Sequence, residues 1–182
     1  MTLRKCLSIF CVLMLLFIFS ACSNDISEIS KSSFNKNIGL NDYGQTTIDA
    51  FINDDIETIK NIFCKNVSDS HNLNDEIQNA FDFIDGNIIS YEKINSEETG
   101  GTRRDGETIR RTGFSDIVGI KTDSGKSYEI LLLCVLEYSE DVSHIGVQDI
   151  SVYEVNYTSE NYLSYDIINK ITVGGVLDGS WD

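Results

Sequence analysis

Hydrophobic positions follow one another almost without interruption at the start of the chain and predict a leader. Arg4 and Lys5 precede an apolar run over residues 6–21, which ends in the small residues Ser20 and Ala21. This run is shorter than the roughly 20 residues that a helix needs to cross a bilayer. A basic start, a short apolar run and a small-residue end follow the plan of a secretory signal. We therefore expect residues 1–21 to be a signal peptide.

Residues 22–40 are predicted to form a tether. Serine and asparagine dominate this stretch, and its isolated apolar residues fit no single period. A flexible coil of this length has an end-to-end distance of about 23 Å. The folded domain is expected to follow, as a single unit over residues 41–182.

Helical spacing of apolar residues marks the first part of this domain. A polar break at residues 53–55 divides the first two helices and supplies a cap for the second. A third helix is expected from Asn74 to Ile84, with Asp85-Gly86 ending it because glycine takes a left-handed conformation without penalty. The apolar positions that define the helices are Ile48, Phe51 and Ile52, then Ile56, Ile59 and Phe63, then Ile77, Ala80, Phe81 and Ile84.

From Asn87 onward the pattern changes to strands, which we expect over residues 87–94, 107–122, 127–138 and 144–157. Arg104-Asp105-Gly106-Glu107 predicts a tight hairpin turn, because Asp-Gly supplies the positive φ angles that a two-residue loop requires. Helices followed by strands joined through short turns indicate an α+β fold. Its N-terminal helices are expected to pack on a curved antiparallel β-sheet.

The strand expected over residues 127–138 is apolar on both faces. Its alternating positions are Ile130, Leu132, Cys134 and Leu136 on one side and Leu131, Leu133 and Val135 on the other. A sheet that faces water on one side would alternate with polar residues. We therefore expect helices to cover one face, and the C-terminal extension, residues 158–182, or a partner such as a second copy to cover the other.

The charge balance is strongly acidic. The formal net charge is −15, and removal of Arg4 and Lys5 with the leader leaves 12 basic and 29 acidic residues, or −17. Such a domain is repelled by nucleic acid, so no nucleic-acid partner is expected. Cationic partners, neutral small molecules or simple solubility remain compatible with this charge.

Cys22 is the residue that we expect to carry a lipid. Phe19-Ser20-Ala21-Cys22 resembles the lipobox of bacterial lipoproteins, in which the cysteine is acylated and becomes the new N-terminus, although Phe19 departs from the usual aliphatic residue. The alternative is ordinary signal cleavage, which would leave Cys22 as a plain thiol. Two acyl chains hold a protein stably at a membrane, whereas one chain holds it marginally. The expected location is the extracytoplasmic face of the cell membrane.

The remaining cysteines, Cys64 and Cys134, lie in apolar stretches and favour buried thiols, although an exported domain could also join them in a disulfide. No zinc site is expected, because His71 and His144 lie far apart without ligand spacing. Both histidines are expected to be solvated or structural. No catalytic residue, metal or cofactor is predicted, since the best-defined strand offers no acid or base on its apolar faces.

Four arginines flank the predicted Asp-Gly turn and are the candidate ligand-binding residues: Arg103, Arg104, Arg110 and Arg111. If the hairpin closes, guanidinium groups from its two arms converge, and such groups bind carboxylate or phosphate in a fork geometry. The ligand would then be a small anion or a lipid headgroup. The alternative is that these charges protect an edge strand from aggregation and pair with neighbouring acids.

Four segments carry a resemblance to a known family: TTIDAFINDDIETIKNIFCKNV, DEIQNAFDFIDGNIISYEK, GGTRRDG and GKSYEILLLCVLEY. Over about residues 43–157 the chain resembles the small lipoproteins of domain of unknown function family 5104, seen mainly in Gram-positive anaerobes. Through that family it is similar in layout to the nuclear transport factor two and SnoaL-like cone, a cystatin-like arrangement in which helices pack into a bent sheet and leave a pocket. The resemblance implies an architecture and a membrane address, and no reaction.

Two classes of function are compatible with these features. The first is a membrane-anchored binding domain that holds a small ligand or peptide in a pocket. The second is an interaction or immunity-type lipoprotein that intercepts cationic peptides or holds a partner protein at the membrane. A SnoaL-like enzyme is the less favoured third reading.

Overall fold

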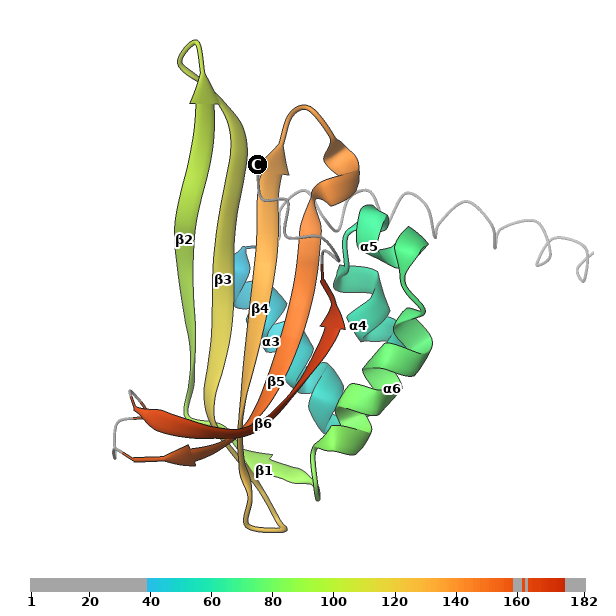
Figure 1. Ribbon diagram of the computed structural model, residues 1–182, viewed down its shortest axis with the longest axis vertical. Helices are drawn as coiled ribbons and strands as arrows, with labels where there is room; N and C mark the ends of the chain where they lie inside the picture. The colour runs from blue at the N-terminus through green and yellow to red at the C-terminus, as the bar shows by residue number, and fades with distance from the viewer. Residues whose placement is uncertain (1–38, 159–161, 163, 176–182) are drawn as a thin grey trace, which may run out of the picture. The chain divides into compact units, whose positions relative to one another are not determined.

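The computed structural model describes residues 39–158, 162 and 164–175, and in them helices precede a sheet (Figure 1). The four α-helices of this part are α3 (Leu40–Ile52), α4 (Ile56–Ile62), α5 (Lys65–Ser70) and α6 (Leu73–Phe83). The six strands are β1 (Ile88–Ser90), β2 (Lys93–Arg104), β3 (Glu107–Thr122), β4 (Ser127–Tyr138), β5 (Gly146–Tyr157) and β6 (Tyr165–Gly174), with a 3-10 turn η1 (Val142–His144) before β5. The predicted α+β class is confirmed. The predicted leader, Cys22 and the tether before Gly39 lie outside the described residues.

Local chemistry sets the helix boundaries. The Asp55 carboxylate accepts a hydrogen bond from the Thr58 backbone N–H at 3.0 Å and caps α4. Asp54 adopts a left-handed φ of 51°, so the predicted break between α3 and α4 is confirmed. Gly86 has φ 85°, and a Cβ there would lie 2.3 Å from Asp123 Oδ1, so the turn after α6 requires glycine. Helix α5 was not expected, because Val67 is its only apolar residue.

The sheet is antiparallel throughout, in the order β1-β3-β4-β5-β6, with β2 also paired to β3. The predicted hairpin turn is confirmed: Arg104 pairs with Glu107, and Asp105 and Gly106 have φ 54° and 88°. The single strand expected over residues 87–94 is wrong. It is two strands, and β2 continues through polar residues to Arg104. That polar stretch has little strand propensity, and its pairing with β3 imposes the extended conformation.

The core lies between the helices and one face of the sheet. Ile117, Ile130, Leu132 and Ile150 are fully buried there. Gly44 allows α3 to approach closely, because a Cβ at this position would lie 2.3 Å from Ser115 Oγ and 2.7 Å from Ile94 Cγ2. Cys64 and Cys134 are buried and not disulfide-bonded, which confirms the prediction of two buried thiols.

The opposite face is covered unevenly, so the expectation of burial on both faces is met only in part, with Val135 buried there. Leu131 and Leu133 are half-buried. The C-terminal extension contributes the ring of Tyr165, which lies 5.8 Å from that of Tyr157. Most of the described extension, however, forms β6 and lengthens the sheet beside β5, where Ile167 and Ile168 are 56% and 63% exposed.

The length and hydropathy of each helix show whether it could cross a membrane. In the part of the chain that the structure describes, no helix is both long enough and apolar enough to cross a bilayer.

Candidate functional site

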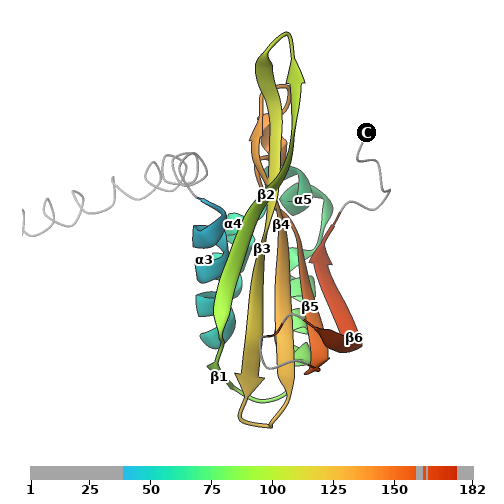
Figure 2. The ribbon, with the colours of Figure 1, turned by 90° about the vertical axis from the view of Figure 1, so that its left-hand side faces the viewer.

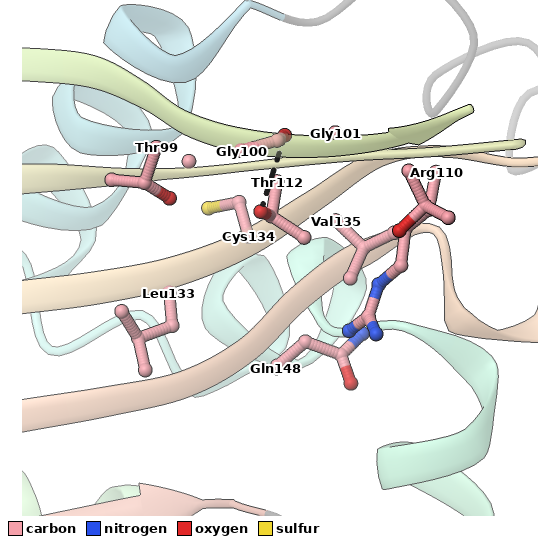
Figure 3. A pocket seen from close by; sticks show the side chains of 11 residues that line it. Thr99, Gly100, Gly101, Arg110, Thr112, Leu133, Cys134, Val135 and Gln148 are labelled. Carbon is pink, nitrogen blue, oxygen red and sulfur yellow. Dashed lines mark hydrogen bonds between the residues drawn. The ribbon is translucent and has the colours of Figure 1, made fainter. Parts of the chain in front are cut away.

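A cavity of about 380 Å³ opens on the sheet face away from the helices (Figure 3). Leu133 and Val135 line it, and they alternate along β4 with the core residues Leu132 and Cys134. Small-molecule sites typically have volumes of about 300–1,000 Å³, and this cavity falls within that range. The lining residues are Thr99, Gly100, Gly101 and Thr102 of β2, Arg110, Thr112 and Gly113 of β3, Leu133, Cys134 and Val135 of β4, and Gln148 of β5.

Irregular strand pairing determines where this cavity forms in the sheet. Shifts in register occur at Glu98/Gly100 and Thr102/Arg103 between β2 and β3, at Arg111/Thr112 between β3 and β4, and at Leu133/Cys134 between β4 and β5. A bulge bends a strand locally and increases its twist. Three neighbouring ladders therefore change direction beside the cavity.

Gly113 allows β2 and α3 to approach β3 closely beside the cavity. A Cβ there would lie 2.6 Å from Leu40 Cδ1 and 2.7 Å from the Glu97 carbonyl oxygen. The second contact is with backbone, which cannot rotate away, so only glycine fits without a shift of β2 or α3. The bare backbone of Gly100 and Gly101 forms another part of the cavity wall.

Arg110 is the only charged residue among the described residues that line the cavity. Its guanidinium carbon lies 5.7 Å from the centre of the Tyr138 ring, a cation–π arrangement. Figure 3 shows the side chain extending from β3 toward Gln148. The Gln148 amide in turn donates a hydrogen bond to the His144 carbonyl oxygen, which holds this side chain in place.

Arg111 does not line the cavity. Its guanidinium pairs with Glu98, with 3.3 Å between Nε and Oε2, and lies 3.7 Å from Glu137. The hydrogen bonds that its guanidinium donates to the Glu98 carboxylate are the main cause that raises the pKa of Arg111. Successive side chains of a strand point to opposite faces. Arg110 and Arg111 therefore cannot contribute to one site.

The other two predicted arginines also lie outside the cavity. Arg104 pairs with Glu140 at 2.8 Å, and both side chains are exposed. The Arg103 side chain is exposed and makes no hydrogen bond or ion pair with a described residue, although its backbone pairs with Thr108. The structure thus brings one of the four predicted arginines to the cavity, and the expected convergence of all four is not found.

Cys134 is not a candidate nucleophile for the cavity, because its side chain belongs to the core on the helix side of the sheet. Burial raises the pKa of Cys134 to about 12. A thiol is a weak nucleophile until it loses its proton. The described lining therefore offers a positive charge, hydroxyl groups, an amide and apolar surface.

A pair of buried carboxyl groups lies elsewhere on the same sheet face. Burial raises the pKa of Glu129 to about 7, and burial also raises the pKa of the neighbouring Asp116. The Tyr165 hydroxyl donates a hydrogen bond to Glu129 Oε1 at 2.7 Å. Asp116 Oδ1 and Glu129 Oε2 are buried without a conventional donor. One shared proton between these two carboxyl groups accounts for both oxygens.

Sequence reasoning missed Asp116, Glu129, Thr112 and Gln148. A period of two along residues 107–122 places Arg110, Thr112 and Asp116 on one face, so part of the signal was present. Gln148 carried no such signal, because it is the extra residue where the β4–β5 register shifts.

The two histidines are structural. His71 Nδ1 lies 3.0 Å from Glu76 Oε1, and its Nε2 lies 3.0 Å from the Gly175 carbonyl oxygen. His144 is half-buried beside Asp141 and Tyr138. Within the described residues, no group of three or more histidine, cysteine or acidic side chains has a geometry that would hold a metal ion.

Comparison with known proteins identifies a family for this chain but gives no activity. No curated protein matches the chain. Residues 46–162, which include the whole cavity lining and the buried carboxyl pair, match the family described as Domain of unknown function (DUF5104). Because this match covers more than half of the sequence, the chain belongs to that family.

Proposed function

We propose that this protein is a membrane-anchored, extracytoplasmic binding domain and that its cavity holds a small organic anion. The observation that carries this proposal is the position of Arg110 in a cavity of about 380 Å³. The described lining contains no carboxylate, although the net charge of the chain is −15. The guanidinium repels a cation, whereas it attracts an anion and can donate hydrogen bonds to it.

The remaining lining favours a ligand with one charged end and a short apolar body. Threonine hydroxyls and the Gln148 amide can donate further hydrogen bonds to an oxyanion. Leu133 and Val135 provide apolar surface for a carbon chain. A short-chain carboxylate combines both properties.

The cone-like layout of SnoaL-related domains is also part of this proposal. Helices packed on one face of a bent sheet support it. The cavity lies on the other face of the sheet, so the proposed ligand site does not depend on a pocket between helices and sheet.

Replacement of Arg110 tests the proposed site. In unlipidated protein, residues 23–182, we expect hexanoate to bind, and Arg110→Gln to weaken binding at least about ten-fold, because a charge-assisted hydrogen bond contributes about 1.5–3 kcal/mol. Arg103→Gln is the matched control, because Arg103 is exposed and lies outside the cavity. Isothermal titration calorimetry with hexanoate, and with hexylamine as the cationic analogue, measures both effects.

Three results would contradict the proposed site. Wild-type protein that fails to bind hexanoate, equal binding of hexylamine, or equal losses in the two variants would each remove the assignment to Arg110. Thermal melts of the variants show whether an observed loss comes from unfolding.

The proposed anchor has a separate test. Cys22→Ala is expected to abolish acylation and leave the precursor unprocessed, because Cys22 alone follows the lipobox-like residues. Metabolic labelling with a clickable fatty acid measures acylation, and Cys64→Ala is the control. Label retained by Cys22→Ala would show that the anchor is misassigned.

A further inference from the structure

The end of β6 brings the chain to the wall of the cavity. The Gly175 N–H donates a hydrogen bond to the Gln148 carbonyl oxygen at 2.9 Å, and Gln148 lines the cavity. A Cβ at Gly175 would lie 3.2 Å from Asp149 Oδ2, and Asp149 lies opposite Leu133 of the cavity lining. Figure 2 shows β6 on the opposite side of the sheet from α3. The residues after Gly175 therefore start beside the cavity, on the face where it opens.

The residues that follow have the chemistry of the ligand proposed for the cavity. Residues 176–182 read VLDGSWD and lie outside the described part of the chain. They carry two carboxylates, Asp178 and Asp182, no basic group, and three apolar side chains, of which Trp181 is the largest. The cavity offers the opposite charge on Arg110 and apolar surface on β4. Segment and cavity are therefore complementary in both respects.

The segment is long enough to reach Arg110. The strand order places β5 and β4 between Gly175 and β3. Neighbouring strands lie about 4.8 Å apart, so β3 is about 14 Å from Gly175 across the sheet. An extended chain covers about 3.3 Å per residue, so seven residues span up to about 23 Å. The Arg110 side chain extends toward Gln148, which shortens the path further (Figure 3).

We propose that residues 176–182 occupy the cavity of their own chain and so autoinhibit the anion site. An aspartate carboxylate of the segment pairs with the Arg110 guanidinium, whose fork of N–H donors matches a carboxylate. Trp181 packs on the apolar side chains of Leu133 and Val135. The autoinhibition rests on the anion site proposed above, because ligand and segment compete for the same guanidinium.

Charge directs the segment to this place. The net charge of the chain is −15, so most of its surface repels an acidic segment. The described cavity lining contains a guanidinium and no carboxylate. Attachment adds to this preference, because a group linked to its site by a short chain has an effective concentration in the millimolar range. A weak contact between segment and cavity is therefore sufficient for occupancy.

Occupancy by the segment makes ligand binding conditional. A free anion must displace the segment before it reaches Arg110. Its apparent dissociation constant is then the intrinsic one divided by the fraction of molecules whose cavity is open. Any change that weakens the contact of the segment with the cavity should therefore strengthen the binding of a free anion.

Fluorescence of Trp181 tests the contact directly, because the chain has one tryptophan. In unlipidated protein, residues 23–182, we expect emission at a shorter wavelength than that of the free peptide VLDGSWD, since the cavity shields the indole. Arg110→Gln should shift the emission to longer wavelength and increase quenching by acrylamide, a neutral quencher. Arg103→Gln is the matched control and should leave both unchanged, because Arg103 lies outside the cavity.

Hexanoate links the segment to the anion site. Saturating hexanoate should expose Trp181 of the wild type to acrylamide. Asp178→Asn together with Asp182→Asn should strengthen hexanoate binding about three-fold or more in calorimetry, because an uncharged segment leaves the cavity open more often. Asp54→Asn together with Asp82→Asn is the control for net charge, since both acids are exposed and lie outside the cavity lining.

Autoinhibition and the anion site fail in different ways. Trp181 emission equal to that of the peptide, or equal hexanoate affinities in the wild type and the Asp178/Asp182 variant, would overturn autoinhibition and leave the anion site standing. Absence of hexanoate binding in every variant, with Trp181 still responding to Arg110→Gln, would remove the small-anion site and support the segment as occupant. Emission that changes with protein concentration would show that another copy supplies the segment, and would overturn the contact within one chain.

Discussion

Leu132→Lys is expected to unfold the domain, whereas Leu133→Lys should leave it folded. Leu132 is fully buried in the core, with Ser115 and Ile150 opposite it on the neighbouring strands. A lysine there would be buried without a partner, a change that costs more than about 4 kcal/mol and uses most of the stability of a typical domain. Leu133 is half-buried and lies opposite Asp149, so a lysine there can reach water or that carboxylate.

Chemical denaturation followed by circular dichroism measures the difference between these two substitutions. The alanine variants Leu132→Ala and Leu133→Ala should both remain folded, so their free energies of unfolding can be compared directly. We expect a loss of about 2–5 kcal/mol for Leu132→Ala and a smaller loss for Leu133→Ala. Equal losses at the two positions would show that Leu133 is as buried as Leu132, contrary to its partial exposure.

Glu129→Gln is expected to remove part of the pH dependence of folding stability. The pKa of Glu129 is raised by burial from 4.5 to about 7 in the folded protein. Between these values the folded state binds the proton more tightly than the unfolded state does, so the free energy of unfolding falls as pH rises from about 4.5 to 7. The stability from this proton is fully present below that window and lost above it.

The size of this change in unfolding free energy follows from the shift in the pKa of Glu129. At about 1.36 kcal/mol per pKa unit, the rise from 4.5 to about 7 corresponds to about 3 kcal/mol. Glutamine keeps the hydrogen bond from Tyr165, stays neutral at all pH values and can donate to Asp116. The variant should therefore match the wild type near pH 4.5 and exceed its stability near pH 8.

Thermal and urea unfolding at pH 4.5, 6 and 8 measures this difference. Glu107→Gln is the matched control, because Glu107 is an exposed glutamate on β3. The large acidic charge affects every variant alike, so the difference between wild type and variant isolates Glu129. Parallel pH profiles for the wild type and Glu129→Gln would contradict the shared proton.

Short-range features of this chain were predictable from the sequence, because each depends on residues close together along the chain. The break at Asn53-Asp54-Asp55 needs only a cap and a left-handed residue, and the turn at Asp105-Gly106 needs only two positive φ angles. The order of helices and strands follows from the same local patterns. The family resemblance also lay in the sequence, and the match over residues 46–162 confirms it.

Strand pairing between distant segments decided the parts of the fold that the sequence did not predict. The polar stretch of β2 is extended because β3 pairs with it, and β6 exists because it pairs with β5. The polar stretch of β2 carries little intrinsic strand preference, whereas β6 is rich in β-branched residues, but no local pattern shows that it pairs with β5. The C-terminal extension therefore lengthens the sheet where sequence reasoning expected it to cover a face.

The candidate site illustrates the same division. The sequence by itself determined that four arginines flank one turn and that apolar residues fill both faces of β4. Tertiary structure decided which arginine meets the cavity, because side-chain direction in a sheet depends on register, and a shift of one residue moves every following side chain to the other face. Four such shifts lie around the cavity that Arg110 lines, and no pattern within a single strand specifies them.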